Sequence, residues 1–183
     1  MATIKVDHIT NSEGTKNLLE KTKKGLGFIP NMYINMGKNE ALLDSYVYAY
    51  QSFRVNAGFS PVEQEVVFLS VAYENNCEYC MAAHSFVGDK LSKVPTEVTD
   101  AIRNGSAIPD AKLAALSKLT RVLTGTRGNA NQEDVNAFLK AGYNESHILG
   151  IITGIAIKTM SNYSNHITSP EVDAVFSARK WKK

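Results

Sequence analysis

The chain has only two cysteines among its 183 residues, and they lie three positions apart, at Cys77 and Cys80. A framework of structural disulfides usually needs several cysteines spread over different loops, so this pair does not predict one. The first seven residues contain no apolar stretch typical of a secretion signal, and we expect the protein in the cytoplasm. Two close cysteines in such a chain indicate redox chemistry or a metal site.

Long apolar runs are also missing. No run of about 18 apolar residues occurs, so no membrane span is expected. The most apolar segment, 148–157, is too short to cross a bilayer and contains Thr153 and two glycines. The net charge of +2 is too small to predict binding to nucleic acid or to a membrane surface. We expect the basic end of the chain, including Arg179, to be a solvated tail.

Strictly alternating apolar and polar stretches, which indicate strands, are absent, and helix signals recur along the chain. The segment 60–63, Ser-Pro-Val-Glu, combines an N-cap, a first-turn proline and a capping-box glutamate, which predicts a helix to about residue 74. Asn76 is then expected to cap a helix that continues to about residue 91. Further helices are expected at 16–24, 31–37, 39–54, 96–103, 110–123, 132–141 and 145–162, with a last one beginning at Ser169. The sequence therefore predicts an all-α fold in one domain, 1–183.

Three reactive side chains share one side of the expected cysteine helix. At 100° per residue, Cys80 and His84 fall at about −60° and −20° relative to Cys77, so all three lie within an arc of about 60°. If Asn76 caps this helix, both thiols lie near its N-terminus, where the positive end of the helix dipole stabilises a thiolate. Because the thiolate is the reacting form of cysteine, this placement favours nucleophilic chemistry.

The preceding helix places Glu65 among apolar side chains. With Val62 at 0°, Glu65 falls at about −60°, inside the arc that also contains Val66 and Leu69. Burial without partners would raise the pKa of this carboxyl and suit it to proton transfer near neutral pH. The break between the two helices is short, so we expect them to pack antiparallel and bring Glu65 toward the dithiol. The alternative is a structural carboxylate tied to an arginine or to backbone groups.

The same residues allow two other interpretations. Cys77, Cys80, His84 and Glu65 have the atom types of a zinc site, but structural zinc sites usually take a second Cys or His pair, and the chain has none. The cysteines could also be a buried, inert pair in a non-catalytic helical interaction protein. The three possibilities, redox dithiol, metal site and inert pair, differ in the chemistry that they allow.

Together, Glu65, Cys77, Cys80 and His84 form the pattern Glu-x11-Cys-x2-Cys-x3-His. This pattern resembles the signature of the carboxymuconolactone decarboxylase-like superfamily, on its alkylhydroperoxidase D branch. Similarity to the same family continues in four short segments, at 27–31, 60–63, 82–84 and 162–166. The last of these resembles a segment of the peroxidase-related members. Tyr79 stands where the best-known members of the branch carry a histidine.

This resemblance implies a compact, multi-helix alkylhydroperoxidase D-like fold, a homo-oligomer, and a thiol-dependent peroxide reductase that needs no cofactor or metal. By position, Cys80 would attack the peroxide and Cys77 would resolve it, while Glu65 and His84 would move protons. An external dithiol of lipoyl or thioredoxin type would reduce the resulting disulfide. A general thiol-disulfide oxidoreductase would use the same residues.

The resemblance also implies how the chain is divided. The catalytic core would occupy about 42–128, between an N-terminal helical extension, 1–41, and C-terminal helices, 129–183.

The expected helix at 145–162 predicts where copies of the chain would meet. Ile148, Ile152 and Ile155 define one face of this helix, whereas Leu149 and Ile157 lie well away from that face. A helix that is apolar on two sides is either central to a large core or covered by a partner on its second side. In a homo-oligomer, Leu149 and Ile157 would then lie at the interface.

Overall fold

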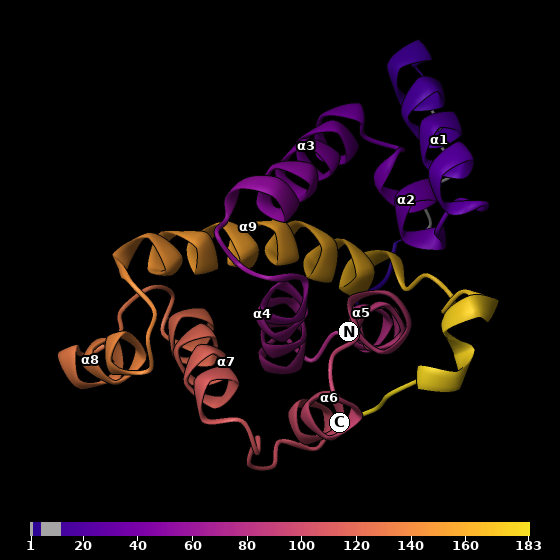
Figure 1. Ribbon diagram of the computed structural model, residues 1–183. Coiled ribbons are helices and arrows are strands. Elements are labelled where there is room, and N and C mark those ends of the chain that lie inside the picture. The colour runs from indigo at the N-terminus through magenta and orange to yellow at the C-terminus, as the bar shows by residue number, and fades with distance from the viewer. Residues whose placement is uncertain (1, 5–11) are drawn as a thin grey trace.

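The computed structural model describes residues 2–4 and 12–183. This part of the chain is built from helices, and no strand occurs in it. The predicted all-α fold is confirmed. The long helix α9, Glu145–Thr168, runs across the molecule, with α1 (Glu13–Leu26), α2 (Asn31–Met36) and α3 (Glu40–Asn56) on one side of it (Figure 1). On the other side lie α4 (Pro61–Glu74), α5 (Glu78–Val87), α6 (Thr96–Asn104), α7 (Ala111–Gly125) and α8 (Gln132–Lys140). A π-helical turn, η1 (Gly88–Ser92), follows α5, and a 3-10 turn, η2 (Ala174–Arg179), lies near the C-terminus.

α4 is the central helix, and its residues from Gln64 to Ala72 are all buried. They are buried because α5, α6, α7 and α9 all pack against α4. A polar side chain on this helix must therefore find its partner inside the protein, since an unpaired buried polar group is costly. Ser70 does so by sharing a hydrogen bond of 2.7 Å with Ser117 of α7. Glu65, on the same helix, faces the same requirement.

Local capping signals set the ends of α4 as predicted. The Ser60 side chain accepts the Glu63 N–H at 3.3 Å, and the Glu63 carboxylate accepts the Ser60 N–H at 2.9 Å. The predicted cap at Asn76 is wrong, because Asn76 takes a left-handed conformation with φ of 54° and Cys77 occupies the N-cap position of α5. Cys77 thus precedes the helix, and Cys80 lies in its first turn.

The C-terminal third departs from the sequence prediction. α9 continues six residues beyond the expected end at 162, to Thr168, where Ser169 ends it with φ of 43°. The helix expected to begin at Ser169 is wrong, since only the short turn η2 forms later. The expected solvated tail is also wrong for Arg179, which pairs with Asp89 at 3.0 Å and Asp100 at 2.7 Å. None of the described helices is long and apolar enough to cross a membrane.

At the other end, α1 begins at Glu13, earlier than expected, and Gly25 lies inside it. Residues 1 and 5–11 of the predicted N-terminal extension lie outside the described part of the chain.

The faces of α9 also differ from the prediction. Ile157 is fully buried inside the chain, so it is not available to an interface, whereas Leu149 is 66% exposed and Ile152 is 48% exposed. Gly154 lets α9 approach α4 closely, because a β carbon added there would lie 2.6 Å from the Val67 side chain. Close packing at this glycine therefore serves the core of one chain, and it holds α9 against the helices that carry the candidate site.

Candidate active site

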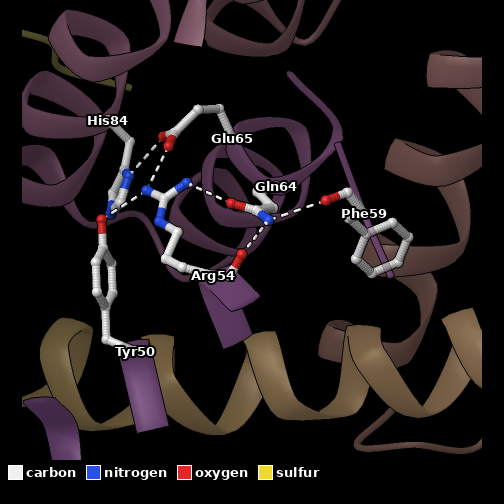
Figure 2. Close-up of polar contacts among 6 residues, drawn as sticks. All are labelled: Tyr50, Arg54, Phe59, Gln64, Glu65 and His84. Atoms are coloured by element: carbon white, nitrogen blue, oxygen red, sulfur yellow. Dashed lines mark hydrogen bonds and ion pairs between the residues drawn. The ribbon is translucent and has the colours of Figure 1, made fainter. Parts of the chain in front are cut away.

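Glu65 is fully buried on α4 and is held by two partners (Figure 2). One carboxylate oxygen lies 2.8 Å from His84 Nδ1 on α5, and the other accepts a hydrogen bond from the Arg54 guanidinium on α3. Arg54 also donates to Tyr50 Oη at 2.6 Å and to Gln64 Oε1 at 3.0 Å. Glu65 thus reaches the cysteine helix at His84, and it also has the arginine partner that the alternative interpretation expected.

The charges in this cluster differ from the sequence prediction. Burial raises the pKa of Glu65, but the charges and hydrogen bonds of His84 and Arg54 outweigh burial and hold that pKa below its ordinary value. The prediction of a raised pKa for Glu65 is therefore wrong. Burial and the nearby positive charge of Lys158 lower the pKa of His84, despite the opposing effect of Glu65. At neutral pH an ionised Glu65 then accepts the Nδ1 proton of a neutral His84, which leaves His84 Nε2 as a proton acceptor.

Both cysteines are free thiols and only 1% exposed. Asn165 Nδ2 on α9 lies 3.2 Å from Cys80 Sγ and 3.7 Å from Cys77 Sγ, so one amide reaches both sulfur atoms. Ser161 Oγ, also on α9, lies 3.8 Å from Cys80 Sγ. The Asn165 amide donates to Cys80 Sγ, which favours the charged form of that sulfur. Because the predicted helix stopped at 162, the sequence analysis did not place Asn165 at the thiols.

The pKa values of the two thiols are shifted in opposite directions. Burial raises the pKa of Cys80, but the hydrogen bond from Cys77, the charges of Lys158 and His84, and the contact with Ser161 together bring it well below the ordinary value. The hydrogen bond to Cys80, burial and the charge of Cys80 raise the pKa of Cys77. Of the two thiols, Cys80 is therefore the one whose surroundings favour the thiolate.

The thiols and the Glu65–His84 pair adjoin through α5, which carries Cys80 and His84 one turn apart. Within the described ranges, neither Glu65 nor His84 makes a hydrogen bond to a sulfur atom. The Phe68 ring packs beside this junction, 4.8 Å from the His84 ring. No group of three or more His, Cys, Asp or Glu side chains in residues 2–4 and 12–183 is arranged to hold a metal ion.

Lys158 is a further residue of this region that the sequence did not predict. Its side chain is fully buried on α9, and its Nζ lies 5.6 Å from the centre of the Phe68 ring. A lysine side chain is ordinarily expected at the protein surface, even on a largely apolar helix. The available signal was its spacing, because Ser161 and Asn165 follow it three and seven positions later on the same face.

Tyr79 links the start of α5 to the C-terminal segment. Its hydroxyl donates to the Asp173 carboxylate, and Asp173 also accepts the Asn31 backbone N–H at 3.2 Å. Burial and the bond to Asp173 raise the pKa of Tyr79. Tyr79 thus acts as a structural link that holds the C-terminal segment on α5. Beside it, a hollow of about 680 Å³ is lined by Glu78, Glu171, Val172, Lys180, Trp181 and Lys182.

No protein-family model matches the chain, and no curated protein matches it. Solved structures do match. A peroxidase-related protein from Silicibacter sp. TM1040, described as uncharacterised, has a TM-score of 0.80 at 18% identity, over 97% of this chain and 95% of that one. The alkylhydroperoxidase core of a peroxidase-related protein from Ralstonia eutropha JMP134 has a TM-score of 0.80 at 16% identity, over 96% and 93% of the two chains.

A third similar structure is that of the debrominase Bmp8. A cysteine-to-alanine variant of Bmp8 in complex with 2,3,4-tribromopyrrole has a TM-score of 0.74 at 15% identity, over 94% of this chain and 92% of that one. These likenesses show that the chain has the alkylhydroperoxidase D-like fold, as the sequence resemblance predicted.

Proposed function

We propose that this alkylhydroperoxidase D-like chain is a thiol-dependent peroxide reductase. The observation that carries the proposal is the pair of buried free thiols, Cys80 and Cys77, both within reach of the Asn165 amide. Their surroundings shift the two pKa values in opposite directions, down for Cys80 and up for Cys77. A thiolate is the nucleophile in peroxide reduction, and a neighbouring thiol is what resolves the product. The fold of peroxidase-related proteins supports the same function.

The first step uses the Cys80 thiolate. Its sulfur attacks one peroxide oxygen, the O–O bond breaks, and Cys80 becomes a sulfenic acid. The leaving oxygen needs one proton, which is taken up from water and passes to it through His84 Nε2, and it departs as water or as an alcohol. The ionised Glu65 keeps the His84 ring oriented and its proton on Nδ1, which is the role that a carboxylate plays beside a histidine base.

The second step uses the Cys77 thiol. Its sulfur attacks the sulfenic acid sulfur of Cys80, a disulfide forms, and water leaves. An external dithiol then supplies two electrons and one proton, which restores the Cys77 thiol and the Cys80 thiolate. Glu78 lines the hollow described above and follows Cys77 directly in the sequence. On the described surface, we therefore expect the external dithiol to approach at this hollow.

The activity is tested by offering three oxidants to the reduced protein: a hydroperoxide, a small disulfide such as oxidised glutathione, and 2,3,4-tribromopyrrole, the molecule bound in the debrominase structure. We expect the hydroperoxide to form the Cys77–Cys80 disulfide fastest. Rapid mixing with quenching by acid and mass analysis gives the three rate constants. A faster reaction with the small disulfide would indicate a general thiol-disulfide oxidoreductase, and a faster reaction with the bromopyrrole would indicate a reductive debrominase.

We also propose that the chain forms a homo-oligomer through the exposed side of α9. Leu149 and Ile152 are exposed there, and a groove of about 210 Å³ lined by residues that include Ser52, Leu149 and Thr153 joins this side to α3. A second copy would cover these apolar side chains, which are costly to leave in water.

Leu149→Glu is therefore expected to dissociate the oligomer, because it places a charge in an apolar interface. Light scattering coupled to size exclusion should change from a multiple of 20.1 kDa to 20.1 kDa in this variant. Lys182→Glu, which reverses a charge at the exposed C-terminal end, is the matched control and should leave the mass unchanged. A wild-type protein that elutes as a single species near 20.1 kDa would contradict the assembly.

A further inference from the structure

Lys158 lies in the interior of the protein without a polar partner. The side chain is fully buried, and its Nζ makes no hydrogen bond to any described residue. A buried positive charge is costly unless an anion compensates it, so an anion is expected near a charged Lys158. The Phe68 ring supplies only a weak cation–π contact at 5.6 Å.

The buried carboxylate of this region does not meet that need. Glu65 is already occupied on both oxygens, by Arg54 and by His84. The acidic group that remains within range of the Lys158 charge is the Cys80 thiol. Lys158 and Ser161 lie one turn apart on the same face of α9, and Ser161 Oγ is 3.8 Å from Cys80 Sγ.

The pKa shifts of two neighbouring groups agree with this pairing. The positive charge of Lys158 lowers the pKa of Cys80 and also opposes protonation of His84. The buried charges thus separate into two pairs, Glu65 with Arg54 and the Cys80 thiolate with Lys158.

We propose that Lys158 sets the redox potential of the Cys77–Cys80 pair by stabilising its reduced form. The proposal rests on the thiol chemistry proposed above and names Lys158 as a positioning residue. Reduction of the disulfide takes two electrons from an external dithiol and one proton, breaks the S–S bond, and yields a Cys77 thiol and a Cys80 thiolate. In the reduced state, Lys158 has an anion beside it.

Oxidation removes that anion. The disulfide is neutral, so Lys158 is left as a buried charge with no compensating partner, and the oxidised state is disfavoured. A dithiol whose reduced form is selectively stabilised is a strong oxidant of other thiols. A peroxide is oxidising enough to form such a disulfide, and the external dithiol then reduces it readily. Lys158 would therefore favour the return step of the cycle and widen the range of dithiols that can serve.

The test is the equilibrium between the protein dithiol and a glutathione buffer at pH 7, followed by mass analysis after acid quench. Lys158→Met keeps a long, flexible side chain and removes the charge. We expect its equilibrium to shift at least about tenfold toward the disulfide, which corresponds to about 30 mV. Lys140→Met, which removes an exposed lysine of α8, is the matched control and should not shift.

A second readout is the number of protons bound on reduction, obtained from the pH dependence of the same equilibrium. We expect one proton near neutral pH for the wild type and close to two for Lys158→Met. The other ionisable groups around the thiols are unchanged in the variant. They include Tyr46 and Arg54 of α3, Glu65 of α4, and Tyr79 and His84 of α5.

An equilibrium for Lys158→Met within about twofold of the wild type, with the same proton count, would overturn the proposal. If that variant does not fold, the wild-type proton count decides, and uptake of two protons at neutral pH would contradict the thiolate–lysine pair. The proposed function can fail separately. If glutathione disulfide oxidises the dithiol but peroxide does not, the peroxidase assignment is lost, and the equilibrium still tests the role of Lys158. A pair that no thiol buffer can oxidise would overturn both.

Discussion

Cys80→Ser is expected to abolish peroxide consumption, whereas Cys77→Ser is expected to react once and stop at a sulfenic acid on Cys80. The reason is the unequal acidity of the two thiols: Cys80 has a pKa well below the ordinary value, and Cys77 has one raised above it. Only the thiolate attacks peroxide at a useful rate. Peroxide remaining after mixing measures the first effect, and trapping with dimedone followed by peptide mapping locates the sulfenic acid.

Helix geometry alone does not assign these roles. Cys77 is the N-cap of α5 and lies nearer the end of the helix dipole, which would favour it as the thiolate. The contacts from α9 reverse this preference, since Ser161 and Asn165 both approach Cys80 Sγ. Dimedone labelling of Cys77 in the Cys80→Ser protein would therefore show that the dipole dominates and that the two roles are exchanged.

Glu65→Gln is expected to lower turnover by about 10²-fold or more, the usual scale for loss of a group in general acid–base catalysis. Glutamine keeps the shape of the side chain but has no charge to hold the Nδ1 proton of His84, 2.8 Å away. Because Glu65 raises the pKa of His84, the substitution also lowers that pKa. The acid limb of the pH–rate profile, where His84 becomes protonated, should accordingly move to lower pH.

Tyr50→Phe is the matched control for this effect. It removes a hydroxyl that binds Arg54 at 2.6 Å in the same network, yet that hydroxyl does not bond to Glu65 within the described contacts. Turnover in this variant should stay within about tenfold of the wild type, below the range expected for an acid–base group. Near wild-type turnover in Glu65→Gln, with thermal unfolding unchanged, would make Glu65 a structural partner of Arg54 only.

Much of the fold could be predicted because its signals are local. The capping box of Ser60 and Glu63 acts within four residues, so it sets the start of α4 whatever surrounds it. The same reasoning failed at Asn76, whose left-handed conformation allows a tight connection that puts Cys77 at the cap. The end of α9 could not be predicted either, because it depends on packing against α2, α4 and α5.

Only part of the candidate site could be predicted from the sequence. The short break between the two helices predicted that Glu65 approaches the cysteine helix, where it meets His84. The direction of the Glu65 pKa shift depends on its partners, and one of them, Arg54, comes from a separate helix. Hydropathy alone places Lys158 at the surface, and only its spacing to Ser161 and Asn165 indicates otherwise. Its burial follows from the contacts of α9 with the helices around it, which only the tertiary structure provides.

The most direct test of the peroxidase proposal is the fate of the dithiol after one equivalent of hydroperoxide. The reduced protein is mixed with peroxide, quenched with an alkylating agent and examined by intact and peptide mass spectrometry. The account predicts a loss of two hydrogens per chain and a linked peptide that joins Cys77 to Cys80. Two alkylated, free thiols that survive an excess of peroxide in the folded protein would contradict it.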